Sequence, residues 1–199
     1  MLQQRLQQFE FNLGRATELV GLGESVTSLT SGTLDATDMY RSALVQAVAA
    51  LDTYIHGVLL DYSVDILCGS RPGTSVARIG LPINVVAELV GAKDKTTLHL
   101  TAISYVAQRL AKETFQRPDS IAQGLSAVGV EKVWSKAFGS GAGKVTEALG
   151  LIVYRRNQIV HACDVDPTSP FTLLPLTAAD AVAAAKTVDT VVRGIHKVL

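Results

Sequence analysis

The sequence is short of cysteine, of net charge and of long apolar runs, and each shortage argues against a class of protein. Its two cysteines, Cys68 and Cys163, form no C-x-x-C pair, and no charged segment followed by an apolar signal core opens the chain. Eighteen basic residues balance eighteen acidic ones, so nucleic-acid binding would need a local patch. No run reaches the roughly 18 uninterrupted apolar residues of a membrane span. We therefore expect a soluble cytoplasmic protein with no membrane partner.

Patterns for metal and phosphate binding are also missing. His99, His196 and the two cysteines have no ligand-like spacing, so we expect neither a zinc site nor another cofactor. The stretch "GSGAGKV" is not a Walker phosphate loop, because Phe138 stands where that pattern needs Gly and Val145 stands where it needs Ser or Thr. We expect no strand before it, and a Walker loop follows a strand.

What the chain does contain is helical periodicity. At 199 residues and 48% hydrophobic composition it is large enough for one well-packed domain. Sustained strand-like alternation is missing, and no repeat, charge block or low-complexity tract marks a second domain. We therefore predict an all-α fold over residues 1–199. Within it, the N-terminal helix and linker, residues 1–34, could lie at the periphery.

The expected helices follow from apolar spacing, caps and breakers. The first helix covers residues 2–20, and a Gly/Ser/Thr-rich linker separates it from a long second helix at 35–67, about 50 Å in length. We next expect a short helix at 82–90 and a longer one at 97–115. One or two short helices should follow from Gln116 to Gly139, capped by Asp119 or Ser120. A further helix should follow the glycine-rich turn "GSGAGK", and a last helix should begin with a capping box of Thr177 and Asp180.

The stretch "LIVYRRNQIVHACD" places polar residues in the helix that follows the glycine-rich turn. Arg156 falls in the middle of the apolar face, where a permanently charged side chain is costly unless a carboxylate or an anionic ligand meets it. Asn157 and His161 are four residues apart and share another face with Tyr154. Arg156 and His161 point about 140° apart, so one helix does not aim both at one point, whereas a second copy of the helix could complete the arrangement.

A structural interpretation of these residues is equally specific. Arg156 would pair with an internal carboxylate such as Asp52, and His161 would cap the helix end before Asp164. Asp52 and His56, four residues apart on the second helix, either hydrogen-bond within the core or stand behind the Arg156 face and support the residues of that face.

The spacing of Arg156, Asn157, three further residues and His161 resembles the Arg, polar residue, spacer, His signature of the HEPN superfamily of α-helical domains. The segments that resemble its RiboL-PSP-HEPN branch are "AALDTYIHGVLLD", "FQRPDSIAQGLSAVGVEKVW" and "RRNQIVHACD". This resemblance covers about two thirds of the chain. It implies a HEPN-like helical bundle, here with a long second helix and extra short helices, that forms a homodimer in which two copies of the signature face each other.

The same resemblance implies a metal-independent endoribonuclease of toxin, antiphage or RNA-processing systems, with a possible antitoxin or defence partner protein. RNA cleavage without a metal needs a base for the 2′-hydroxyl, an acid for the leaving oxygen and positive charge on the phosphorane. His161 can act as the acid or the base, and Arg156 can bind the phosphate through two hydrogen bonds. Asn157 can orient the phosphate or the imidazole. Arg155, beside them, either contacts RNA phosphate or is a solvated surface residue.

The sequence therefore leaves two candidate functions. The first is an endoribonuclease whose substrate is RNA and whose catalytic residues are Arg156, His161 and Asn157. The second is an inactive HEPN-like helical module that binds a partner or regulates it. The intact signature favours the first function, and the neutral net charge keeps the second open.

Overall fold

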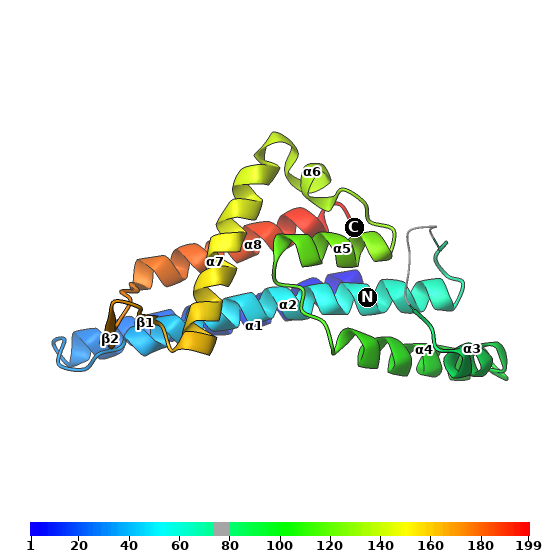
Figure 1. The fold of residues 1–199 in the computed structure, drawn as a ribbon, viewed down its shortest axis with the longest axis horizontal. Helices are drawn as coiled ribbons and strands as arrows, with labels where there is room; N and C mark the ends of the chain where they lie inside the picture. The colour runs from blue at the N-terminus through cyan, green and yellow to red at the C-terminus, as the bar shows by residue number, and fades with distance from the viewer. Residues whose placement is uncertain (74–79) are drawn as a thin grey trace.

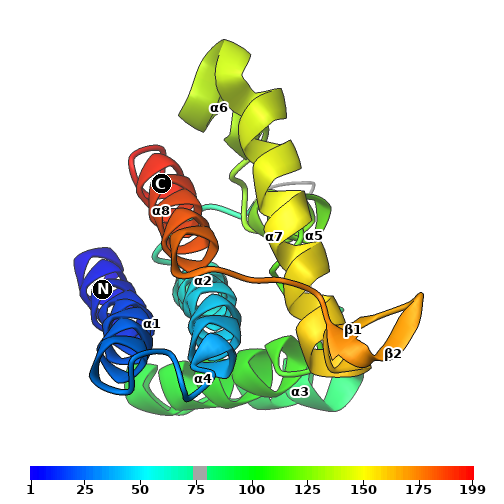
Figure 2. The same cartoon turned by 90° about the vertical axis from the view of Figure 1, so that its left-hand side faces the viewer.

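The computed structural model describes residues 1–73 and 80–199 and confirms the all-α fold class. The elements, in chain order, are α1 (Leu2–Leu29), α2 (Thr37–Leu67), α3 (Ile83–Val90), α4 (Lys95–Leu110), α5 (Pro118–Ala127), α6 (Val133–Phe138), the 3-10 turn η1 (Gly139–Gly141), α7 (Ala142–Ala162), β1 (Val165–Asp166), β2 (Ser169–Leu173) and α8 (Ala178–His196). Figures 1 and 2 show α1, α2 and α8 side by side, with α7 crossing this layer steeply.

The central helix of the layer is α2, which contacts α1, α4, α7 and α8. Its predicted apolar stripe is the middle of the core, because Ala47, Leu51, Ile55 and Val58 are each 0% exposed. Phe9 from α1 and Ile195 from α8 pack into the same cluster. Burial on several sides explains why α2 is apolar over most of its circumference.

α2 is also long and apolar enough to cross a membrane by length and composition alone. In this fold, 61% of its most apolar window is buried inside the protein. The burial by α1, α7 and α8 accounts for that composition without a bilayer.

α1 differs from its prediction in length and in position. The helix continues nine residues beyond the predicted end, to Leu29, through what looked like a linker. Gly23 suits this continuation because a Cβ there would lie 2.6 Å from the Tyr40 ring, so only glycine lets the two helices come this close. Phe9 is 1% exposed, so α1 is part of the core and not peripheral.

α4 ends earlier than its apolar spacing predicts, at Leu110 instead of Phe115. The backbone N–H of Phe115 donates to the Asp52 carboxylate at 2.6 Å, which diverts the chain away from a helical path. The following segment forms two short helices, α5 and α6. Neither Asp119 nor Ser120 caps α5, because the helix begins at Pro118 with Arg117 as its N-cap residue.

The glycine-rich turn is shorter than predicted, since Gly143 and Lys144 already belong to α7. After α7, the strands β1 and β2 form an antiparallel hairpin that the sequence did not predict. Its strands have two and five residues, too short to show a period of two. The capping box of Thr177 and Asp180 at the start of α8 is confirmed.

Candidate functional site

Arg155 and Arg156 are adjacent on α7 but have different partners. Arg155 donates to Asp164 Oδ2 at 2.8 Å and to the carbonyls of Leu174 and Pro175, each at 3.1 Å. Its guanidinium is therefore bound within the fold and is not a solvated surface group, while contact with RNA phosphate stays a prediction. The cause is Asp164, which comes close only because the chain turns back after α7.

Asp164 also accepts a hydrogen bond from a second arginine, Arg41, near the start of α2. Arg41 donates through Nε to Asp164 Oδ2 at 2.8 Å and through Nη2 to the Leu174 carbonyl, also at 2.8 Å. Asp164 is 1% exposed and adopts a left-handed backbone with φ 57°. The backbone N–H of Leu174 donates to the Asp164 carbonyl at 2.8 Å. This Arg41–Asp164–Arg155 cluster joins the end of α7, the hairpin and α2.

Arg156 has no carboxylate partner within the described residues. Its Nη1 donates to Asn157 Oδ1 at 3.1 Å, and its Nε is buried without a hydrogen-bond partner. Asp52, the expected internal partner, accepts instead from the Phe115 N–H and from Gln116 Nε2. The ion pair of the structural interpretation is therefore absent from residues 1–73 and 80–199. Arg156 keeps a half-buried charge that nothing in those residues neutralises.

Tyr154, Asn157 and His161 share the face of α7 predicted for them, where Tyr154 and His161 are exposed and Asn157 is half-buried. Tyr154 is 64% exposed, and its hydroxyl accepts a hydrogen bond from Gln158 at 3.4 Å. His161 is exposed in the last turn, and its ring makes no hydrogen bond in the described part of the chain. The helix end is closed by the Asp164 N–H donating to the Gln158 carbonyl, so His161 is not needed as a cap.

A groove runs along this face between α7 and the start of α5. We call it the α5–α7 groove; its volume is about 450 Å³. The residues lining it are Arg117, Pro118, Asp119, Gly143, Thr146, Glu147, Gly150, Val153, Tyr154 and Asn157. The sequence reasoning missed Arg117, although an arginine directly before the proline that opens a helix lies at the positive end of that helix.

Asp52 and His56 hold the segment after α4 through hydrogen bonds. His56 Nδ1 contacts the Asp52 backbone carbonyl at 2.9 Å and the carboxylate at 3.3 Å, while Nε2 contacts the Leu110 carbonyl at 3.2 Å. Both ring nitrogens meet acceptors, so the ring is arranged to be protonated and to donate from both. We call these contacts the Asp52–His56 clamp. These contacts agree with the hydrogen-bonding alternative for this pair, and the alternative that the pair supports the Arg156 site stays a prediction.

The clamp changes the ionisation of both residues. The hydrogen bond to the Asp52 carboxylate outweighs desolvation and raises the pKa of His56 to about 9. Burial by itself would raise the pKa of Asp52, but the hydrogen bonds from His56, Gln116 and the Phe115 backbone outweigh burial and lower it. The pair is therefore an imidazolium and a carboxylate at neutral pH.

Within residues 1–73 and 80–199, no group of three or more His, Cys, Asp and Glu side chains could hold a metal ion. No protein-family model, no curated protein and no solved structure matches the chain. The function is therefore inferred from the geometry around α7.

Proposed function

We propose that the protein is a metal-independent endoribonuclease, acting in the cytoplasm as a toxin or antiphage effector, with Arg156, Asn157 and His161 as its catalytic residues. The observation that carries this proposal is the uncompensated charge of Arg156. A half-buried guanidinium without a carboxylate is costly, and an anionic ligand removes that cost. A phosphodiester is an anion of the right geometry for a guanidinium.

The side chains around Arg156 supply the rest of the chemistry. The 2′-hydroxyl of RNA attacks the adjacent phosphorus, and the bond from phosphorus to the 5′-oxygen breaks. His161 is exposed and free to take the first proton or to give one to the leaving oxygen. Arg156 stabilises the charge on the phosphorane, and Asn157, which already contacts Arg156, orients the guanidinium.

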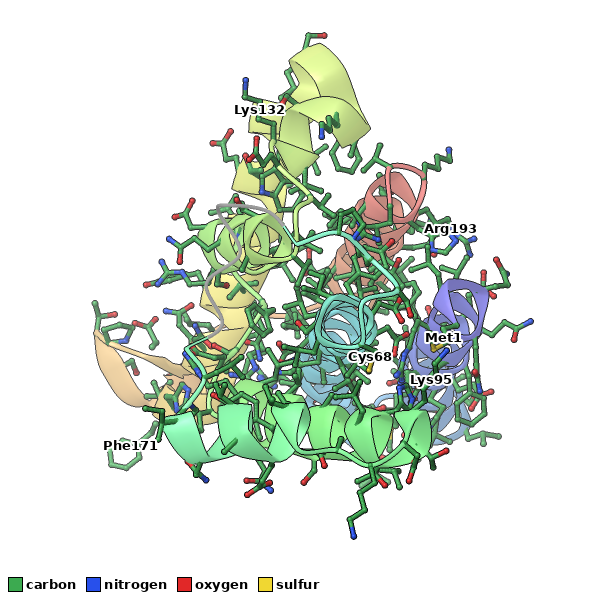
Figure 3. The ribbon with its side chains drawn as sticks, turned by 90° about the vertical axis from the view of Figure 1, so that its right-hand side faces the viewer. Met1, Cys68, Lys95, Lys132, Phe171 and Arg193 are labelled. Atoms are coloured by element: carbon green, nitrogen blue, oxygen red, sulfur yellow. The ribbon has the colours of Figure 1, made fainter. Side chains whose placement is uncertain are left out.

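We further propose that the active form is a homodimer. Large apolar side chains of α7 and the hairpin are uncovered: Leu151 is 65% exposed, Tyr154 is 64% exposed and Phe171 is fully exposed. Figure 3 shows the Phe171 ring pointing away from the rest of the molecule. A second copy placed over α7 would cover these residues and bring a second His161 to the site, so that one histidine acts as base and the other as acid.

Cleavage of single-stranded RNA in excess EDTA tests the proposal. The wild type should cut the RNA and leave DNA of the same sequence intact. His161→Ala should lose proton transfer, typically about 10² to 10⁴-fold, and Arg156→Ala should be similarly impaired. His99→Ala and Lys144→Ala are matched controls, because both residues are exposed and lie outside the site. Loss of cleavage in EDTA, or full activity of His161→Ala, would contradict the proposal.

A second candidate function is a helical module that binds a partner protein. The α5–α7 groove favours it, because Asp119 and Glu147 place carboxylates beside Arg117, and carboxylates repel RNA phosphates. A wild-type protein that is folded and dimeric but cuts no RNA would support this function instead.

A further inference from the structure

The α5–α7 groove reaches the proposed catalytic residues. The start of α5 lies beside α7, as Figure 1 shows, and Asn157 lines the groove between them. The side-chain oxygen of Asn157 accepts a hydrogen bond from Arg156 Nη1 at 3.1 Å. The groove volume of about 450 Å³ is within the roughly 300–1,000 Å³ of small-molecule sites. A ligand in this groove would therefore lie next to the guanidinium proposed to bind the scissile phosphate.

Two glycines leave the α7 wall of the groove open. Gly143 and Gly150 both line the groove, and a Cβ at either position would meet nothing within 4 Å. They lie on the same face of α7 as Glu147 and Asn157, because spacings of three, four and seven residues return to one side of a helix. The wall therefore leaves space above the helix backbone in which a flat ring can lie.

Three charged side chains line the groove, those of Arg117, Asp119 and Glu147. Within residues 1–73 and 80–199, none of them makes an ion pair or a side-chain hydrogen bond. Asp119 lies in the first turn of α5, where the positive end of the helix partly offsets its charge. Glu147 lies beyond the first turn of α7 and has no such compensation. The groove therefore offers an arginine as donor and an uncompensated carboxylate as acceptor.

These two groups fit a nucleobase better than a phosphate. A carboxylate repels a phosphate, but it accepts hydrogen bonds from the N–H groups of a base. Guanine carries two adjacent donors, N1–H and the N2 amino group, and two adjacent acceptors, O6 and N7, which one arginine can bind together. On the pairing edges of adenine, cytosine and uracil, each donor stands beside an acceptor, which would repel the carboxylate.

From these observations we infer that the α5–α7 groove binds the guanine base of a nucleotide next to the scissile phosphate. Glu147 accepts from N1–H and from the N2 amino group, and Arg117 donates to O6 and N7. The phosphate stays outside the groove, at Arg156. This inference rests on the proposed function for the position of the phosphate, whereas base recognition in the groove can be measured without cleavage.

Binding of RNA that cannot be cleaved tests the groove by itself. A short 2′-O-methyl oligouridine with a single guanosine lacks the attacking hydroxyl, and inosine in place of guanosine removes only the N2 amino group. Fluorescence anisotropy should show that the wild type binds the guanosine oligonucleotide about 10-fold more tightly, the value of one hydrogen bond to a charged acceptor. Glu147→Ala should bind both equally. Glu24→Ala, which changes an exposed glutamate of α1, should keep the preference.

Two further variants test the arginine and the location. The wild type should also prefer guanosine to 7-deazaguanosine, which lacks the N7 acceptor, and Arg117→Ala should lose this preference but keep the one against inosine. Gly150→Leu should fill the groove and remove both preferences. Its helical circular dichroism should be unchanged, because leucine forms helices better than glycine and the space above Gly150 is open.

The outcomes separate this inference from the proposed function. A wild type without base preference, or a preference that survives Glu147→Ala and Gly150→Leu, would overturn the inference even if the protein cuts RNA in EDTA. A guanosine preference that depends on Glu147, in a protein that cuts no RNA, would support base recognition and contradict the proposed endoribonuclease. Cleavage of unmodified RNA next to guanosine that loses this selectivity in Glu147→Ala would support both.

Discussion

At the scale of single residues, two adjacent arginines near the end of α7 differ in whether a carboxylate of the described residues pairs with them. Successive side chains on a helix point about 100° apart, so Arg155 and Arg156 leave α7 in different directions. Arg155 meets the buried Asp164, which also binds Arg41. Arg156 meets only the side chain of Asn157 in the described residues. Within the described residues, Arg156 is therefore the arginine of this pair whose charge no carboxylate meets.

Asp164→Asn should destabilise the protein strongly, because the buried Arg41 and the half-buried Arg155 lose the buried carboxylate that they share. Breaking such a buried pair typically costs about 3–5 kcal/mol, measured as a fall in the free energy of unfolding in urea. Asp38→Asn is the matched control, since Asp38 also pairs with Arg41 but is 85% exposed. It should cost less than about 1 kcal/mol. Equal losses in the two variants would show that the Asp164 cluster does not stabilise the fold.

The Asp52–His56 clamp predicts a pH dependence of stability. The pKa of His56 is about 9 in the folded protein, above the ordinary histidine value of about 6.5. Its stabilisation is therefore complete below pH 6.5 and is lost as the pH rises through 9. For this half-buried ring we expect about 1–2 kcal/mol after solvent screening.

Urea unfolding of the wild type and of His56→Gln at pH 6 and pH 10 measures this effect. Groups other than His56 titrate alike in both proteins, so the difference between their free energies of unfolding isolates the clamp. That difference should shrink at pH 10. A difference that stays constant with pH would contradict a protonated His56.

At the scale of elements, periodicity and caps predicted the helices, and tertiary contacts set the ends that were missed. The stripe of α2 and the capping box of α8 are local patterns, so the sequence shows them directly. The early end of α4 depends on Asp52, which is 63 residues away from its partner Phe115. The continuation of α1 depends on the Tyr40 ring packing against Gly23. Contacts of this kind leave no periodic signal in the chain.

Part of the candidate site also follows from local sequence patterns, and part depends on contacts between distant residues. The shared face of Tyr154, Asn157 and His161 follows from helical geometry and was predicted from spacing alone. The pairing of Asp164 with Arg41 joins residues 123 positions apart, so no local pattern reveals it. The sequence does indicate that Arg41 needs a partner, because Arg41 lies at the start of an apolar helix, where a buried charge must be paired. It does not indicate that this partner is Asp164.

Thr177→Ala should weaken α8 by removing the side-chain half of its capping box. The Thr177 hydroxyl accepts from the Asp180 N–H and contacts the Asp180 carboxylate. Loss of such a cap typically costs about 1 kcal/mol, which lowers the melting temperature of a domain of this size by about 2–4 °C. Thr190→Ala, on the exposed face of the same helix, should cause no such fall. Equal melting temperatures for Thr177→Ala and wild type would show that the cap adds nothing.

At the scale of the whole molecule, α1, α2 and α8 form a layer that buries the core, while α7 crosses this layer and exposes the face that carries Tyr154 and His161. Figure 2 shows α7 and the hairpin standing to one side of the three parallel helices. Leu151 and Tyr154 of α7 and Phe171 of the hairpin are exposed. A rigid layer carrying an exposed α7 is an arrangement that a second copy could complete.

Tyr154→Glu should therefore shift the protein from dimer to monomer, because it places a charge on the face that we expect the second copy to cover. Light scattering should give twice 21.1 kDa for the wild type and the monomer mass for the variant. Phe11→Glu changes a 68% exposed aromatic residue of α1, away from this face, and should stay dimeric. A wild type that is monomeric at micromolar concentration and still cuts RNA would contradict the dimer.

The most direct test of the central claim replaces one atom of the substrate. If Arg156 and His161 promote attack by the 2′-hydroxyl, an RNA oligonucleotide cut by the protein in EDTA should end in a 2′,3′-cyclic phosphate. The same oligonucleotide with a single 2′-deoxy nucleotide on the 5′ side of the scissile phosphate should not be cut there. Mass spectrometry of the products distinguishes the two substrates. Cleavage of the 2′-deoxy oligonucleotide at the same bond would contradict the mechanism.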